Sequence, residues 1–195
     1  DHSTISWPGD VRFSRVENRA SGITSRLTMS THTGTHIDAP KHFLFDKGGV
    51  DTIDMSKLIG KCKVIEIKNQ ISNIKVKDIK IKISKGDRIL FKTRNSALYK
   101  KGRFTADYTS LSLEAAQYLV RKKIALVGID YLGIEAKSAP GHPVHKTLLR
   151  AGIVNVEGLE VLASPLIILI RKNLVATFHG RAVTRLVKLR RYAET

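Results

Sequence analysis

The sequence predicts a single α/β domain over residues 1–195, with a mixed sheet and flanking helices. Short apolar runs, typical of buried strands, alternate with segments that carry the apolar spacing of helices. No internal repeat, low-complexity tract or linker interrupts the chain. Its 195 residues, 42% of them hydrophobic and 26% charged, are enough to form one buried core.

Buried strands are predicted where a segment is short, apolar and bounded by glycine or charged residues. Three are expected, in KCKVIEI (residues 61–67), RILFKT (88–93) and IALVGID (124–130). The last third of the chain is expected to add two more, in PLIILI (165–170) and RAVTRLVKL (181–189).

Two helices are expected between these strands. The first covers residues 112–123, where Ser112 can cap the amino end and Glu114 suits its positive partial charge. The second covers residues 144–152 and ends at Gly152, because glycine adopts the left-handed conformation that commonly follows a helix.

Residues 31–42, THTGTHIDAPKH, contain three of the seven histidines and an aspartate. The segment resists helix formation because its threonines are β-branched, a glycine lies within it and a proline lies near its end. If the backbone is extended, every second side chain shares one face. That face would carry all the chemically capable residues of the segment, which are His32, His36, Asp38 and His42.

Two neutral imidazoles and one carboxylate are the donors of many hydrolytic zinc centres, and three ligands leave one position open for water. Asp38 has two oxygens and could bridge to a second ion. A second group of donors lies in residues 141–160, which offer His142, His145, Glu157 and Glu160. His145 and Glu157 could meet if the strand-like IVNV turns back along the predicted helix.

Composition limits the other classes of function. The formal charge of +17 would attract anions, but no nucleic-acid signature is present and the aromatic residues are not interleaved with the basic runs, which favours solvated lysine faces. Cys62 is the only cysteine, which excludes an internal disulfide and a cysteine-based zinc site. No G-x-S-x-G serine hydrolase motif occurs. With no membrane-length apolar run and no signal peptide visible in DHSTISWPGD, a cytoplasmic location is expected.

Four segments together resemble one known family. HTGTHIDAPKHF is similar to the H-x-G-T-H-x-D-x-P-x-H signature of the cyclase family of metal-dependent hydrolases, which includes bacterial kynurenine formamidases. WPGD (7–10), LVGIDYLGIE (126–135) and AGIVNVEGLEVL (151–162) resemble further elements of that family, in the same order. Gly133 stands where many members have serine, and RKNLVATFHGRAV lacks the family's G-x-D-G-x-P-like turn.

The resemblance implies a swivelling β/β/α type of fold, a homodimer or tetramer, and two zinc ions per chain, with manganese as another metal that accepts these donors. It implies that one ion is held by His32, His36 and Asp38, the other by Asp38, His145 and Glu157, and that His42 is the general acid and base while Trp7 lines the substrate pocket.

The expected function is hydrolysis of an amide C–N bond in a small aromatic substrate by a metal-activated water, as in the kynurenine formamidases of tryptophan catabolism. Two alternatives stay open on the sequence. One is an isatin hydrolase-like enzyme or another hydrolase of cyclic amides or lactones. The other is a basic protein without enzymatic activity that binds anions or nucleic acid.

Overall fold

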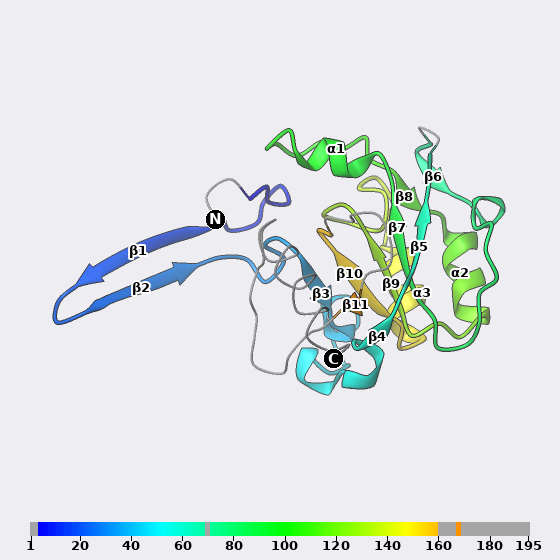
Figure 1. The fold of residues 1–195 in the computed structure, drawn as a ribbon, viewed down its shortest axis with the longest axis horizontal. Helices are drawn as coiled ribbons and strands as arrows, with labels where there is room; N and C mark the ends of the chain where they lie inside the picture. Colours follow the sequence, from blue (N-terminus) through cyan, green and yellow to red (C-terminus); the bar gives the residue numbers. More distant parts are fainter. Residues whose placement is uncertain (1–3, 69–70, 160–166, 169–195) are drawn as a thin grey trace, which may run out of the picture.

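A mixed five-stranded sheet lies at the centre of this computed structural model, which describes residues 4–68, 71–159 and 167–168 and confirms the α/β class (Figure 1). Its strands, in spatial order, are β3 (His36–Asp38), β10 (Val154–Glu157), β9 (Leu126–Ile129), β7 (Arg88–Lys92) and β5 (Lys63–Glu66). The last four are parallel, and β3 pairs antiparallel with β10 at one edge.

The helices are α1 (Asn95–Tyr99), α2 (Leu113–Arg121) and α3 (Pro143–Arg150), and the last two confirm the predicted pair. Ser112 caps α2, since its hydroxyl accepts a hydrogen bond from the amide of Ala115 at 3.2 Å. Gly152 follows α3 with φ +68°, the left-handed conformation expected there. Short 3-10 turns are η1 (Pro40–His42), η2 (Val50–Thr52), η3 (Met55–Lys57) and η4 (Val76–Asp78).

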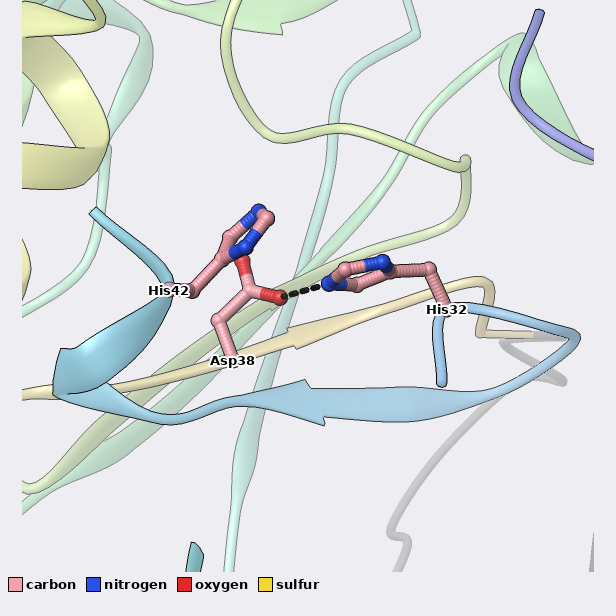
Figure 2. Close-up of side chains that lie close together, drawn as sticks. All are labelled: His32, Asp38 and His42. Carbon is pink, nitrogen blue, oxygen red and sulfur yellow. Dashed lines mark ion pairs between the residues drawn. The ribbon is translucent and has the colours of Figure 1, made fainter. Parts of the chain in front are cut away.

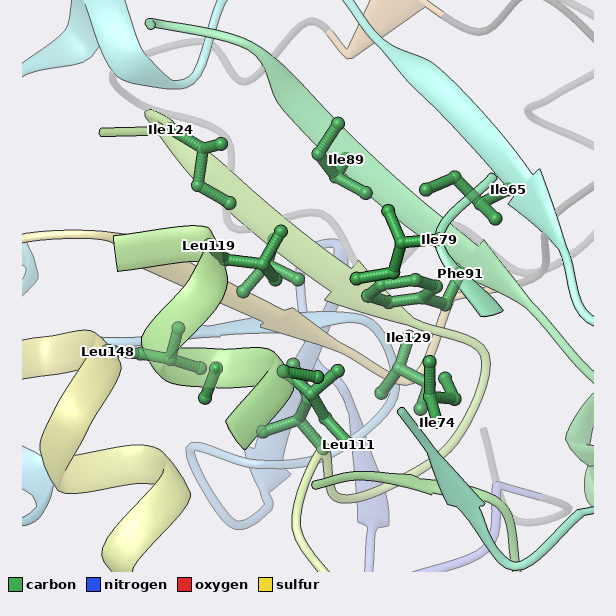
Figure 3. Packing of buried hydrophobic residues seen from close by; sticks show 14 of the residues in the cluster. Ile65, Ile74, Ile79, Ile89, Phe91, Leu111, Leu119, Ile124, Ile129 and Leu148 are labelled. Atoms are coloured by element: carbon green, nitrogen blue, oxygen red, sulfur yellow. The ribbon is translucent and has the colours of Figure 1, made fainter. Parts of the chain in front are cut away.

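Side chains of the central strands alternate between two apolar layers. On β7, Ile89 and Phe91 point into the layer beneath α2 and α3, while Leu90 points into the layer on the other face (Figure 3). Leu119 of α2 and Leu148 of α3 fill the helical side, and all five side chains are fully buried. This packing fixes α3 against the sheet, which matters for the site below.

On strand β10, the buried side chains that face the helices are polar instead of apolar. Val154 and Val156 join the apolar layer on the opposite face, so Asn155 and Glu157 point the other way, toward α3. Both are buried, at 0% and 3% exposure. Two polar side chains buried in the interior of a sheet are unusual and indicate a functional site.

A hairpin of β1 (Ser14–Arg19) and β2 (Ile23–Thr28) extends away from the sheet and was not predicted (Figure 1). Every residue of both strands is exposed. The segment is rich in charged and hydroxyl side chains, so its alternation lacks the apolar period of a core strand.

The structure differs from the sequence expectation for residues 31–42 and covers only part of the two strands expected in the last third of the chain. The extended conformation predicted for residues 31–42 is wrong at both ends, because only His36–Asp38 is a strand, residues 31–35 turn and Pro40–His42 is a 3-10 helix. Within PLIILI the structure contains β11 (Ile167–Ile168), paired with β4 (Gly60–Lys61), whereas RAVTRLVKL lies outside the described residues. A second short pair joins β6 (Asn73–Ile74) to β8 (Ser110–Leu111). Among the described residues, no helix is long and apolar enough to cross a membrane.

Candidate metal centre

The centre is built on the register between β3 and β10. His36 lies opposite Glu157, and Asp38 lies opposite Asn155. Residues two apart on a strand share a face, and directly opposed residues on an antiparallel pair are neighbours. These four side chains therefore form the corners of a square on the helical face of the sheet. The Nε2 atom of His36 is 3.5 Å from Asp38 Oδ1 and 3.7 Å from Glu157 Oε2.

His145 reaches the same square from α3. Pro143 begins this helix, so His145 lies in its first turn, where packing against the sheet buries the ring. Its Nε2 atom is 3.1 Å from Glu157 Oε1 and 3.7 Å from Asp38 Oδ2. The meeting of His145 and Glu157 that the sequence left conditional is thus present in the structure.

His32 and His42 approach Asp38 from the two ends of β3 (Figure 2). His32 projects from the preceding turn and places Nε2 3.8 Å from Asp38 Oδ1, while His42 projects from η1 with its ring centroid 4.3 Å from that of His32. An extended chain was expected to bring them together. They meet instead because the chain turns inward on both sides of the strand.

The turn before β3 depends on a close contact between two glycine residues. Gly34 and Gly158 both have positive φ, at +73° and +67°. A Cβ atom on Gly158 would lie 2.2 Å from the carbonyl oxygen of Gly34. Thr35 ties the two segments together, since its hydroxyl donates to the carbonyl of Gly158 at 2.7 Å. The absence of a Cβ on Gly158 therefore allows the turn that contains Gly34 to approach the end of β10.

The atoms that face the centre are those a metal ion requires. His36 Nε2 and Asp38 Oδ1 are buried without a hydrogen-bond partner in the described part of the chain, although buried polar atoms are normally paired. Ligands about 2.0–2.2 Å from a tetrahedral zinc ion lie roughly 3.3–3.6 Å apart. The separations of 3.5–3.8 Å between Asp38 and the three imidazoles, and of 3.1 Å between His145 and Glu157, are close to that spacing. The donor set therefore fits a metal site.

Asp38 has a different set of neighbours at each oxygen. Oδ1 faces His32 and His36, whereas Oδ2 faces His145. Asp38 could therefore contribute one oxygen to each of two groups of donors. Further triads of possible ligand atoms also lie within 4.8 Å of one another, namely His32, Asp38 and His42; His36, Asp38 and Glu157; and Glu135, His142 and His145.

The charged groups of the centre shift the pKa values of their neighbours. Burial alone would lower the pKa of both inner imidazoles, but the carboxylates reverse the shift. Asp38 and Glu157 raise the pKa of His36 to about 9, and Glu135 together with Glu157 raises the pKa of His145 to about 10. Burial would raise the pKa of Asp38, yet His36 and His145 lower it to about 2. The site thus holds carboxylates that stabilise positive charge, as a cation-binding centre must.

Sequence reasoning did not select Glu135 or Asn155, which both contact proposed ligands of the centre. Glu135 is buried, and its Oε2 atom is 2.8 Å from Nδ1 of His145, while its Oε1 accepts a hydrogen bond from the amide of Val144 at 2.6 Å. A carboxylate on Nδ1 orients the ring so that Nε2 is available as a ligand. The only sequence signal for Glu135 is its place at the end of LVGIDYLGIE, a few residues after a buried strand.

Trp7 lies in an aromatic cluster, where its ring packs edge-to-face on Phe104 at 5.1 Å and on Tyr108 at 6.4 Å. Gly133 leaves room for this packing, because a Cβ there would lie 3.1 Å from the indole, closer than an ordinary van der Waals contact. The WPGD turn also reaches the centre through Asp10, which sequence reasoning did not select and whose Oδ2 is 3.9 Å from Nδ1 of His32.

Comparisons with known proteins point to one family. The sequence model of a family described as "Putative cyclase" matches residues 1–136. The kynurenine formamidase of Geobacillus thermodenitrificans is 34% identical over 159 residues, which cover 78% of this chain and 75% of that protein. A solved structure described as a potential metal-dependent hydrolase with cyclase activity superposes with a TM-score of 0.73 at 35% identity, covering 85% of this chain and 81% of the other. Isatin hydrolase A from Labrenzia aggregata superposes with a TM-score of 0.67 at 25% identity, covering 78% and 72%.

Proposed function

The chain belongs to the cyclase family and is a metal-dependent hydrolase of C–N bonds, and we propose that its substrate is a small aromatic formyl amide of the kynurenine type. The observation that carries the proposal is the convergence of three imidazoles on the two oxygens of Asp38, with Glu157 beside two of those imidazoles. The kynurenine formamidase relatives support the substrate class.

We propose that the centre holds two divalent ions, zinc in preference to manganese. His32, His36 and Asp38 would hold one, and Asp38, His145 and Glu157 the other. When bound, such ions supply Lewis acidity and lower the pKa of a water molecule toward 7, so that hydroxide is available to attack an amide carbon. Glu135 keeps the Nε2 atom of His145 directed at the centre throughout.

His42 is proposed as the general acid and base. Its ring is exposed to solvent beside that of His32, so it is accessible to a substrate at the centre. Burial lowers the pKa of this imidazole, with the charge of Asp38 opposing the shift, so that the ring is mostly neutral near pH 7. A neutral ring can take a proton from the attacking water and return it to the departing amine nitrogen.

Trp7 is proposed to contact the aromatic ring of the substrate. Its indole is only partly buried within its cluster, which leaves part of the ring accessible. An edge or face contact between aromatic rings contributes about 0.5–1.5 kcal/mol beyond burial. That contribution would favour aromatic over aliphatic amides.

The experiment is a substrate panel on protein of measured metal content. N-formylkynurenine and formanilide are expected to give the highest kcat/KM, an aliphatic formamide a lower value, and the chelator-treated protein none. If isatin or another cyclic amide is turned over faster, the second candidate holds, which the isatin hydrolase neighbour favours. Metal-loaded protein that cleaves no amide in the panel would overturn both candidates.

We also propose that the protein is a homo-oligomer in which the β1–β2 hairpin contributes to the interface. Val16, Ile23 and Leu27 are 55%, 71% and 55% exposed on this projecting element, and apolar side chains in such a position suit contact with another surface. Ile23 and Leu27 share one face of the hairpin. Replacing both with Ser is expected to lower the mass measured by light scattering to that of a monomer, and an unchanged mass would contradict the role of the hairpin.

A further inference from the structure

His36, Asp38 and Glu157 occupy three corners of the square on β3 and β10, and Asn155 occupies the fourth. Unlike the other three, Asn155 is not a proposed metal ligand. The side chain is completely buried, with 0% exposure. Its Nδ2 atom donates one hydrogen bond to Asp38 Oδ2 and one to Glu157 Oε1, each at 2.8 Å. A single amide group therefore links the two carboxylates of the centre.

The direction of this amide is set by charge. An amide nitrogen carries two hydrogens, one for each carboxylate, whereas a flipped amide would place its oxygen against two negatively charged oxygens. The Oδ1 atom of Asn155 has no hydrogen-bond partner among the described residues. Leaving a buried acceptor unpaired is unfavourable, so the two bonds made by Nδ2 must outweigh that cost.

The hydrogen bonds from Asn155 fall on the same two carboxylate oxygens that face Nε2 of His145. Asp38 Oδ2 and Glu157 Oε1 each receive a bond from Asn155, while Asp38 Oδ1 receives none and faces His32 and His36. These two bonds, together with one from the amide of Ile134 to Glu157 Oε1 at 2.7 Å, restrict the orientation of both carboxylates. Ligands held in place in this way lose less conformational freedom on binding a metal.

We propose that Asn155 is a positioning residue that holds Asp38 and Glu157 in the geometry for metal binding. It acts through these two carboxylates. The inference rests on the proposed function only in taking the centre to be a metal site, and it holds for any substrate.

The test compares metal binding by three variants of the full chain. Asn155→Ala removes both hydrogen bonds, and Asn155→Leu removes them while keeping a side chain of similar size, so that one variant remains if the other fails to fold. Asn95→Ala is the matched control, because Asn95 is also 0% exposed and makes two hydrogen bonds with the backbone of Thr109, away from the centre. Zinc affinity is measured by competition with a chromogenic chelator, and the visible absorption of the cobalt-loaded protein reports ligand geometry.

Both Asn155 variants are expected to bind zinc about 10–100-fold more weakly than the unchanged protein and to alter the cobalt spectrum. Asn95→Ala is expected to lower thermal stability while leaving affinity and spectrum unchanged. Zinc affinity of a folded Asn155 variant within about twofold of the unchanged protein would overturn the inference. If the unchanged protein binds no divalent metal, the inference and the proposed mechanism both fail, whereas weaker binding without turnover of any amide would reject only the proposed function.

Discussion

Asp38 is the residue on which the centre depends most, because both of its oxygens face imidazole nitrogens. Asp38→Ala is expected to remove both metal ions, since it deletes the carboxylate shared by the two ligand sets. His36→Ala deletes one donor and is expected to remove one ion or weaken its binding. Elemental analysis of the purified variants measures the difference. Full metal content in the Asp38 variant would show that the proposed ligand sets are wrong.

The proposed role of His42 as the general acid and base can be tested by a single substitution. His42→Ala is expected to retain both metal ions while kcat falls by about 10²–10⁴, the usual contribution of a positioned acid or base. Lys41→Ala, at the exposed neighbouring position, is the control and should leave kcat unchanged. Because the ligand atoms of His32, Asp38 and His42 lie within 4.8 Å of one another, His42 could also bind a metal. Loss of an ion from the His42 variant would assign it that role.

At the scale of elements, the contact between Gly34 and Gly158 holds the turn before β3 against the end of β10. Gly158→Ala places a methyl group 2.2 Å from a backbone oxygen, and backbone cannot move aside as a flexible side chain can. The turn that carries His32 must shift, so both thermal stability and metal affinity are expected to fall.

Gly102→Ala is the matched control for that change. Gly102 has the same φ of +67° but open space around its Cβ position. The Gly102→Ala variant therefore incurs only the backbone strain of a left-handed residue, about 1–2 kcal/mol, and should leave metal affinity unchanged. If the two variants lose the same stability in thermal unfolding and both bind metal normally, the close approach does not position the site.

At the scale of the whole molecule, stability and metal binding are expected to respond oppositely to pH. Folding raises the pKa of His36 to about 9 and of His145 to about 10, from an ordinary value of 6.5. A raised pKa stabilises the fold fully below the unfolded value, and this contribution is lost as pH rises through the folded value. The metal-free protein should therefore lose stability between about pH 6.5 and 10.

Metal ions bind neutral imidazoles, so metal affinity should rise over the same range of pH. Urea unfolding of chelator-treated and metal-loaded protein, at about pH 6 and about pH 9.5, measures both trends. In His36→Gln the loss of metal-free stability with rising pH should be smaller. Equal stability of the metal-free protein at the two pH values would contradict the charge coupling of the centre.

The sequence by itself determined the elements that depend on near neighbours in the chain. Apolar period and end residues were sufficient for α2, α3 and the central parallel strands, because propensity and capping act over a few residues. Period two also placed His36 and Asp38 on one face, which the strand β3 bears out. The types of donor in residues 31–42 and 141–160 were sufficient to indicate a metal centre.

Only the tertiary structure decided which donors meet. Asn155 and Asp38 are 117 residues apart, and their contact follows from the register of β10 against β3, which local patterns do not encode. His32 and His42 converge through a turn and a 3-10 helix that the expected extended chain lacked. Asn155 had no distinguishing pattern in the sequence, and Glu135 had only its place after a buried strand, because a buried polar residue differs from an exposed one only in what packs around it.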